Sequence, residues 1–321
     1  MDPTGPAALT VIVVNWNGGE YVRRCLDRLF AHPVSVAFDV IVVDNDSRDG
    51  SADAVERDST LTGRVGRVRV VRATENLGFG RANNLAFRMT RSPYVLLLNP
   101  DTEVGPAALD TLLDTLRAHP RAGAVGPRLV SRDGSTQPSV WRNPPSPGHV
   151  LIDGLGLYRL LPARLRGELL LGRHWAHDRL RRVPMLAAAA LLVRREAIDA
   201  TGGFDERFHM YGEDNDWCAR LTRAGFDLIF QPAAVVTHLD GRSSDQRWDT
   251  LERRRVQLDA RFRFERRHRS RAWVALSDLA TCFVYAVAHV RSVFTGRDRA
   301  VIAVTFAEHA RNLKRNVFGR P

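Results

Sequence analysis

The sequence predicts an α/β fold built on a mostly parallel sheet with helices on both faces. Short β-branched apolar runs occur at 9–15, 38–45, 68–73 and 94–100. Helical patterns lie between and after them, because apolar residues recur three and four positions apart. Strands that are apolar throughout are buried on both faces, so helices must cover both sides of such a sheet.

The later part of the chain is less regular. Residues 131–182 are rich in Pro, Gly and Arg and predict loops around short helices. A strand and a helix follow, and the helix is expected to stop at Gly202-Gly203. The next segments predict a helix through Ala224 and a terminal strand pair at 226–238. We therefore expect one domain over 1–240 and a helical extension over 241–321.

The net charge of +11 is concentrated at the end of the chain. From residue 241 onward there are 18 Arg and Lys against 8 Asp and Glu, so the first 240 residues are almost neutral. The start of the chain lacks the pattern of a signal peptide, and its three cysteines are scattered without metal-binding spacing. These features predict a cytoplasmic protein.

The extension contains an apolar helical pattern at 273–293 next to an Arg-rich segment. Asp278 and His289 argue against a membrane-spanning helix. Two interpretations stay open. The helix either packs on the sheet domain, or it lies in the interface of an anionic membrane, which would make the protein peripheral on the cytoplasmic face.

Polar residues follow the predicted strands at the points where these strands end. Asn15 follows the first, Asp44 the second, Asn99 and Asp101 the fourth, and His238 the last. In open α/β sheets this edge binds ligands. Asp and Asn also favour turns. An oxygen-ligand pair spaced i and i+2 after a buried strand suits a hard cation that bridges a diphosphate, and a histidine nitrogen would favour Mn²⁺ over Mg²⁺.

Three carboxylates, Glu213, Asp214 and Asp216, begin the helix predicted after Gly212. Acidic side chains are common in the first turn of a helix, where they interact favourably with the helix dipole. The same three side chains could also bind a metal or include a general base. The residues by themselves leave these three interpretations open.

Six motifs in order resemble the inverting glycosyltransferases of family 2, in the rhamnosyltransferase-like branch. They are VIVVNWNG, VIVVDNDSRDGS, ENLGFGRANN, LLLNPDTEV, LLVRREAIDATGGFDERFHMYGEDNDWCARLTRAGF and VVTHLDGRSS. The resemblance implies a GT-A fold, a dTDP-, UDP- or GDP-sugar donor and a divalent cation, Mn²⁺ or Mg²⁺. It also implies a donor-binding half over about 9–130 and an acceptor half over about 131–240, followed by the basic helical extension.

The resemblance assigns roles to the residues that match its motifs. Asp44 is expected to contact the nucleoside with the help of Asn15, and Asn99 and Asp101 stand in the metal-binding Asp-x-Asp motif, with Asp101 touching the ion. His238 is the other metal candidate. The further donor-binding positions are Asn76, Arg81 and Asn83.

Asp214 matches the catalytic base, with Glu213 supporting the base or the acceptor and Asp216 holding the first turn. An inverting displacement needs such a carboxylate beside the acceptor hydroxyl. Ala188 stands where this branch often has Gly, in a segment that lines the acceptor site. Trp141 and Trp175 either stack on sugars or simply pack.

The function expected from the resemblance is transfer of a sugar, best rhamnose, to a glycan or polyprenyl-diphosphate-linked acceptor in cell-envelope polysaccharide synthesis. The alternative is a non-catalytic protein that binds a nucleotide sugar, or nucleic acid through its Arg-rich tail. We expect no nucleic acid, because a sensor has no need of the Asp214 arrangement. An oxidoreductase is disfavoured, since no Gly-x-Gly-x-x-Gly follows the first strand.

Overall fold

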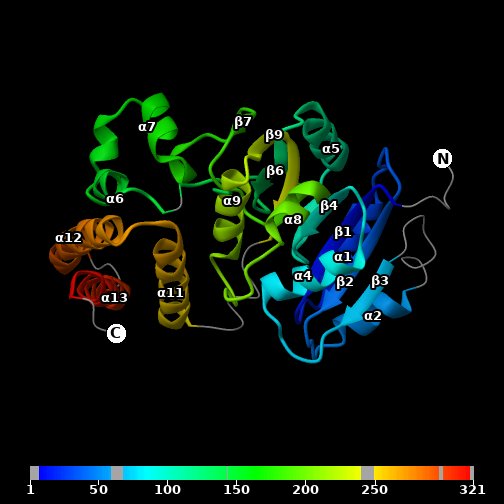
Figure 1. The fold of residues 1–321 in the computed structure, drawn as a ribbon, viewed down its shortest axis with the longest axis horizontal. Coiled ribbons are helices and arrows are strands. Elements are labelled where there is room, and N and C mark those ends of the chain that lie inside the picture. The colour runs from blue at the N-terminus through cyan, green and yellow to red at the C-terminus, as the bar shows by residue number, and fades with distance from the viewer. Residues whose placement is uncertain (1–6, 59–67, 143, 240–248, 296–298, 319–321) are drawn as a thin grey trace. The chain divides into compact units, whose positions relative to one another are not determined.

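The structure is a computed structural model that describes residues 7–58, 68–142, 144–239, 249–295 and 299–318 (Figure 1). The chain forms two compact units. The sheet unit comprises Met1–Trp141 and His177–Ser243, and the helical unit comprises Arg142–Ala176 and Ser244–Pro321. The expected boundary at residue 240 lies near the end of the sheet unit. Residues 142–176, which we expected within the acceptor half, belong to the helical unit instead.

Within the described residues, the sheet has nine strands in the order β3-β2-β1-β4-β8-β6-β9-β5, with β7 paired to β9. Their bounds are β1 Leu9–Asn15, β2 Phe38–Asp44, β3 Val68–Arg72, β4 Tyr94–Leu98, β5 Thr102–Val104, β6 Ala122–Val130, β7 Arg181–Arg182, β8 Ala190–Arg194 and β9 Asp227–His238. Strands β1 to β4 pair in parallel, as the sequence predicts. The other half is mixed, because the chain enters β8 at the carboxyl edge of β4 and therefore runs antiparallel to it.

The predicted strand pair at 226–238 is one strand, β9. Its parallel register with β6 shifts between Pro127 and Arg128, which pair with Gln231 and Val235. Pro232 lies in the skipped stretch and has no N–H to donate to a ladder. The irregularity that suggested two strands is therefore a local disruption within a single strand.

Helices cover both faces of the sheet. They are α1 Glu20–Phe30, α2 Ser51–Arg57, α4 Phe79–Met89, α5 Ala108–Ala118, α8 Arg195–Thr201 and α9 Glu213–Arg223. The main core joins one face of β1, including Val11 and Val13, to the apolar sides of α1 and α5. Helices α4, α8 and α9 contact the sheet outside this core. In the described residues of the sheet unit, these helices thus leave the carboxyl edge of the sheet to loops.

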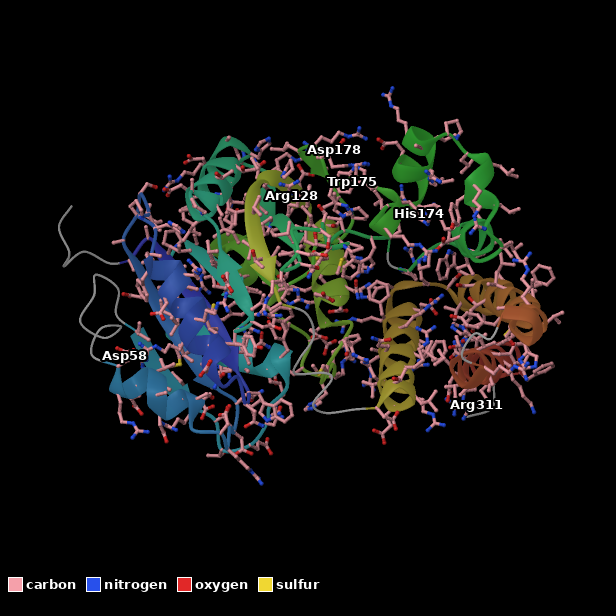
Figure 2. The ribbon with its side chains drawn as sticks, turned by 180° about the vertical axis from the view of Figure 1, so that it is seen from behind. Asp58, Arg128, His174, Trp175, Asp178 and Arg311 are labelled. Atoms are coloured by element: carbon pink, nitrogen blue, oxygen red, sulfur yellow. The ribbon has the colours of Figure 1, made fainter. Side chains whose placement is uncertain are left out.

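The helical unit contains α6 Pro147–Gly154, η1 Leu157–Leu160, α7 Ala163–Leu170, η2 Gly172–His174, α11 Thr250–His268, α12 Arg271–Thr295 and α13 Arg299–Phe318. Helix α12 packs against α13 and α6, and α11 packs against α13. Within α12, Arg271–Ser292 is long and apolar enough to cross a membrane, with a mean hydropathy of 1.5 and one third of the stretch buried. Trp175 (Figure 2) is only 6% exposed and contacts Gly167. It packs inside this unit and offers no open stacking face.

Candidate active site at the carboxyl edge of the sheet

The first part of the site lies where β1 and β2 end. The Asn15 side chain is fully buried, and its Nδ2 donates to the hydroxyls of Ser51 at 2.9 Å and Ser47 at 3.2 Å. The same nitrogen lies 3.5 Å from Asp44 Oδ1, and Arg72 lies 3.8 Å from the other Asp44 oxygen. Asp44 is thus a buried carboxylate held in one orientation at the strand end, as a nucleoside-binding side chain requires.

The next part is the loop that leads into α4. Asn45 Nδ2 donates to Asn76 Oδ1 at 3.2 Å, and that oxygen also accepts the Gly78 N–H at 3.0 Å. Gly78 has a φ of 78°, and a Cβ at this position would clash with the carbonyl oxygen of His209. Asn76 therefore shapes this loop. Asn45 also holds this loop, because it bonds Asn76 and accepts the Leu77 N–H. The sequence indicated Asn45 only as a polar residue after a strand.

Arg81 and Asn83 sit on the first turns of α4 and differ in exposure. The Arg81 side chain is 43% exposed and lies 3.5 Å from Glu75 and 3.9 Å from Glu206. Asn83 is fully buried, and its Nδ2 donates to the Phe79 carbonyl at 2.9 Å. Arg81 is accessible to an anionic ligand, whereas Asn83 faces inward and bonds within its own helix.

The two metal candidates lie together because β5 pairs with β9. Thr102 lies opposite His238 in this antiparallel ladder, which brings the His238 Nε2 to 3.6 Å from Asp101 Oδ1. His238 Nδ1 bonds Gln137 Oε1 at 2.9 Å, and Gln137 Nε2 donates to the His238 carbonyl at 2.8 Å. Because Gln137 Oε1 is bonded to Nδ1, Nε2 is the ring nitrogen that faces the carboxylate, as in metal-binding histidines, whose second ring nitrogen is held by a hydrogen bond.

One carboxylate and one imidazole are a suitable but partial ligand set for Mn²⁺, which also binds phosphate oxygens and water. Within the described parts of the chain, no group of three or more His, Cys, Asp or Glu side chains is arranged to hold a metal. Phosphate from the donor would therefore have to complete the coordination. Gln137 carried no sequence signal, because the partner that gives it a role is about a hundred residues away.

The entrance to β8 connects the metal candidates with the base candidate. The Asn99 N–H donates to the Ala189 carbonyl at 2.8 Å. One residue earlier, the backbone N–H of Ala188 favours the ionised form of the Asp214 carboxyl. The end of β4 and the start of α9 are thus linked through two consecutive residues. Ala188 is itself buried.

The carboxyls of Glu213 and Asp214 have perturbed protonation at the start of α9. Burial raises the pKa of Asp214 to about 6, although the N–H groups of Asn215 and Ala188 oppose the rise. Burial, followed by the charge of Asp214, raises the pKa of Glu213 to about 8. At neutral pH, Asp214 is therefore mostly ionised and Glu213 mostly protonated. A base and a neutral acid stand side by side.

Asp216 has a different role. It is fully buried and pairs with Arg220 at 2.7 Å. Arg220 also donates to the carbonyls of Thr201 and Gly203, both at 2.6 Å. Asp216 therefore anchors α9 to the end of α8, in agreement with its expected place in the first turn.

The family model for glycosyl transferase family 2 matches residues 10–174. The chain is 32% identical to the N-acetylglucosaminyl-diphospho-decaprenol L-rhamnosyltransferase of Mycobacterium tuberculosis over 265 residues, which cover 74% of this chain and 77% of the relative. It is 31% identical to the pre-mycofactocin glycosyltransferase of the same species, over 77% of this chain and 46% of that protein. The chain belongs to glycosyltransferase family 2.

Solved structures share the fold. The mannosyltransferase PcManGT from Pyrobaculum calidifontis, in complex with GDP-Man and Mn²⁺, superposes with a TM-score of 0.61 at 19% identity and covers 100% of this chain and 90% of its own. GalNAc-T7 with UDP, GalNAc and Mn²⁺ gives 0.60 at 14% identity, over 98% of this chain and 56% of its own. The predicted GT-A fold is confirmed, and the chain is a glycosyltransferase.

Proposed function

We propose that this protein transfers a sugar, best rhamnose, from a nucleoside-diphosphate sugar to a polyprenyl-diphosphate-linked acceptor in cell-envelope polysaccharide synthesis, with inversion at the anomeric carbon. The observation that carries the proposal is Asp214, a half-buried carboxyl with a pKa of about 6, linked through Ala188 and Ala189 to Asn99. The M. tuberculosis relative, whose name specifies a rhamnosyl donor group and a decaprenyl diphosphate acceptor, supports the choice of sugar and acceptor.

In the proposed reaction, Asp214 accepts the proton of the acceptor hydroxyl while that oxygen attacks the anomeric carbon. The bond from the anomeric carbon to the diphosphate oxygen breaks on the opposite face, and the nucleoside diphosphate leaves with the electron pair. A carboxyl with a pKa near 6 is a stronger base than an ordinary aspartate, yet it is still ionised at pH 7.

Because Glu213 is neutral at pH 7, it adds no second negative charge beside the proposed base Asp214. With a pKa of about 8 it carries its proton at neutral pH, so it can donate a hydrogen bond to the acceptor. Its Oε2 is buried and has no hydrogen-bond partner within the described structure. A bound acceptor hydroxyl would satisfy this atom.

The donor would bind along the rest of the edge. Asp44 and Asn15 would hold the nucleoside, and the exposed guanidinium of Arg81 would meet the phosphates. Asp101 and His238 would hold Mn²⁺ or Mg²⁺, which supplies positive charge for the leaving diphosphate when it is bound. Asn99 would contribute from the loop that carries Asp101, while Asn76 would preserve the shape of the loop that leads into α4, and Asn83 bonds within α4 itself.

The lipid-linked acceptor places the reaction at a membrane. We propose that the protein is peripheral on the cytoplasmic face, where the Arg-rich extension is attracted by anionic lipid and by the acceptor diphosphate.

The function can be tested with purified full-length protein and a panel of dTDP-, UDP- and GDP-sugars, beginning with dTDP-rhamnose. We expect release of nucleoside diphosphate that requires Mn²⁺ or Mg²⁺, and product formation with polyprenyl-diphosphate-linked N-acetylglucosamine. Asp214→Asn should abolish transfer and remain folded, whereas Asp199→Asn, at an exposed aspartate of α8, should retain it. Failure to bind or hydrolyse any donor would refute the enzymatic assignment, and near-full transfer by Asp214→Asn would refute the base.

A further inference from the structure

Helix α12 exposes a row of large apolar side chains and buries several polar ones beside Val274 and Val284. Four large apolar residues are more than half exposed: Leu276 (56%), Leu279 (56%), Phe283 (54%) and Val290 (63%). On the inward side, Ser277, Asp278, Thr281 and Ser292 are at most 3% exposed. A helix at the surface of a water-soluble protein shows the reverse arrangement.

The inward polar groups are paired with the neighbouring helices. Asp278 bonds His309 Nδ1 at 2.7 Å through one carboxylate oxygen and accepts the Asn312 side-chain amide at 2.8 Å through the other. Ser277 lies 3.3 Å from the guanidinium of Arg261 on α11. These bonds fix the orientation of α12. They also turn Asp278 away from the exposed side, so its charge does not oppose contact of that side with a membrane interface.

The outward residues form a continuous strip. Leu276, Leu279, Phe283 and Val290 are spaced three, four and seven positions apart, so they fall within about 60° of arc at 100° per residue. The strip is roughly 21 Å long at 1.5 Å per residue. Exposed arginines, Arg271 and Arg291, stand near its two ends. We call these four apolar residues the α12 strip.

We infer that the α12 strip inserts into the interfacial layer of an anionic lipid bilayer, with α12 parallel to the membrane plane. This inference rests on the proposed function, because it supplies the surface by which the enzyme meets a lipid-linked acceptor. Acyl chains match a strip that offers no hydrogen-bonding side chain, and the terminal arginines match the lipid phosphates. The apolar strip provides the main attachment, and the charge of the tail has a secondary part.

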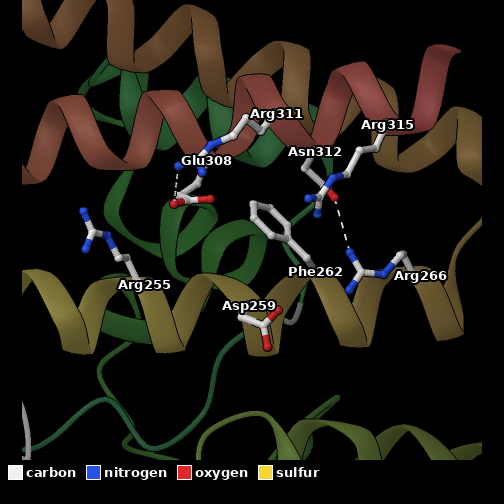
Figure 3. A pocket seen from close by; sticks show the side chains of 8 residues that line it. All are labelled: Arg255, Asp259, Phe262, Arg266, Glu308, Arg311, Asn312 and Arg315. Carbon is white, nitrogen blue, oxygen red and sulfur yellow. Dashed lines mark hydrogen bonds and ion pairs between the residues drawn. The ribbon is translucent and has the colours of Figure 1, made fainter. Parts of the chain in front are cut away.

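The arginines of the helical unit are in large part committed to contacts within it. A pocket of about 210 Å³ between α11 and α13 is lined by four arginines around Phe262 (Figure 3). Arg266 bonds Asn312, and Arg311 pairs with Glu308. Arg255 and Arg315 have no side-chain partner in the described parts of the chain. Substitution of these two arginines therefore tests whether charge attaches the protein to the membrane, in comparison with substitution of the α12 strip.

The test is flotation of the full-length protein with vesicles of phosphatidylcholine and phosphatidylglycerol at 0.15 M and 1 M salt. The wild type should float at both, because insertion of apolar side chains is not screened by salt. The variant Leu276→Gln/Leu279→Gln/Phe283→Gln should lose about a hundredfold in partitioning, since about half of each side chain is still available for burial. Leu180→Gln, at an exposed leucine of the sheet unit, should not change flotation.

The variant Arg255→Gln/Arg315→Gln should lower flotation severalfold at most, and only at low salt. Thermal unfolding and donor hydrolysis should match the wild type for all variants, so that loss of the proposed activity is distinguishable from loss of attachment. If the triple variant unfolds, Phe283→Ala by itself should still weaken partitioning by a measurable factor. Unchanged flotation of the apolar variants would overturn the inference. The inference would also be overturned if vesicle binding of the wild type disappeared in 1 M salt. A wild type that forms a dimer but binds no vesicles, together with a triple variant that is monomeric, would overturn it as well.

Discussion

The protonation of Asp214 should set the acid limit of catalysis. With a pKa of about 6, Asp214 is about nine-tenths ionised at pH 7 and about one-tenth ionised at pH 5, so the transfer rate should fall roughly tenfold between these values. Glu213 titrates near pH 8 and is neutral over this range. Glu213→Gln should therefore keep the same acid limb, because burial, and not the neighbouring carboxyl, causes most of the Asp214 shift.

The same substitution should change how stability depends on pH. The pKa of Glu213 is raised from 4.5 to about 8, so the folded state binds this proton more tightly than the unfolded state. The resulting stability is fully present below pH 4.5 and is lost as the pH rises towards 8. Glu213→Gln keeps a neutral side chain, so its free energy of unfolding should exceed that of the wild type at pH 8 by at least about 1 kcal/mol.

These predictions for Asp214 and Glu213 are tested by transfer rates at saturating donor from pH 4.5 to 9 and by urea unfolding at pH 5 and pH 8. Glu196→Gln is the control, because Glu196 is an exposed glutamate in the first turn of α8. A rate that is flat between pH 5 and pH 7 would contradict the assignment of Asp214. The explanation by burial would be contradicted if the acid limb of the rate profile moved by more than one pH unit in Glu213→Gln. It would also be contradicted if the free energy of unfolding of the wild type rose from pH 5 to pH 8 relative to that of this variant.

Two further substitutions probe the metal pair and the α4 loop. Gln137→Ala frees the ring of His238, so calorimetry with Mn²⁺ and nucleoside diphosphate should show about tenfold weaker metal binding; equal affinity would argue against metal binding by His238. Gly78→Ala should cost more stability than Gly50→Ala, because both glycines have φ near 75° but only Gly78 abuts the carbonyl of His209. In urea unfolding, Gly50→Ala should lower the free energy of unfolding by about 1 kcal/mol and Gly78→Ala by at least twice that. Equal losses would show that the loop at Gly78 can relax.

The strand-end polar residues illustrate what the sequence could predict. Asn15 and Asp44 were expected at one edge because parallel strands end together, and the buried ends of β1 and β2 hold them there. The proximity of Asp101 and His238 was harder to predict. It depends on the antiparallel pairing of β5 with β9, and no local pattern encodes a partner more than a hundred residues away.

Other features were beyond sequence reasoning for physical reasons. The grouping of 142–176 with the C-terminal helices depends on packing such as that of Gly154 against Val284, where the absence of a side chain lets α6 approach α12. The apolar face of α12 was visible as a period, but a period does not say which side is buried. The buried side is identified by Asp278, which in the sequence argued against a membrane-spanning helix and which the structure places inside.

Ala188 and Ala189, the two alanines before β8, should limit how the acceptor preference of this enzyme can change. The Ala188 N–H favours the ionised form of Asp214, the proposed base, and the Ala189 carbonyl accepts the N–H of Asn99, in the proposed metal motif. One peptide unit separates the two alanines. If Asp214 is the base, a substitution that moves this peptide to admit a different acceptor should also shift the base relative to the departing nucleotide. New acceptor preferences should therefore arise by changes elsewhere around the acceptor, while the length of the 187–190 segment stays constant in active relatives.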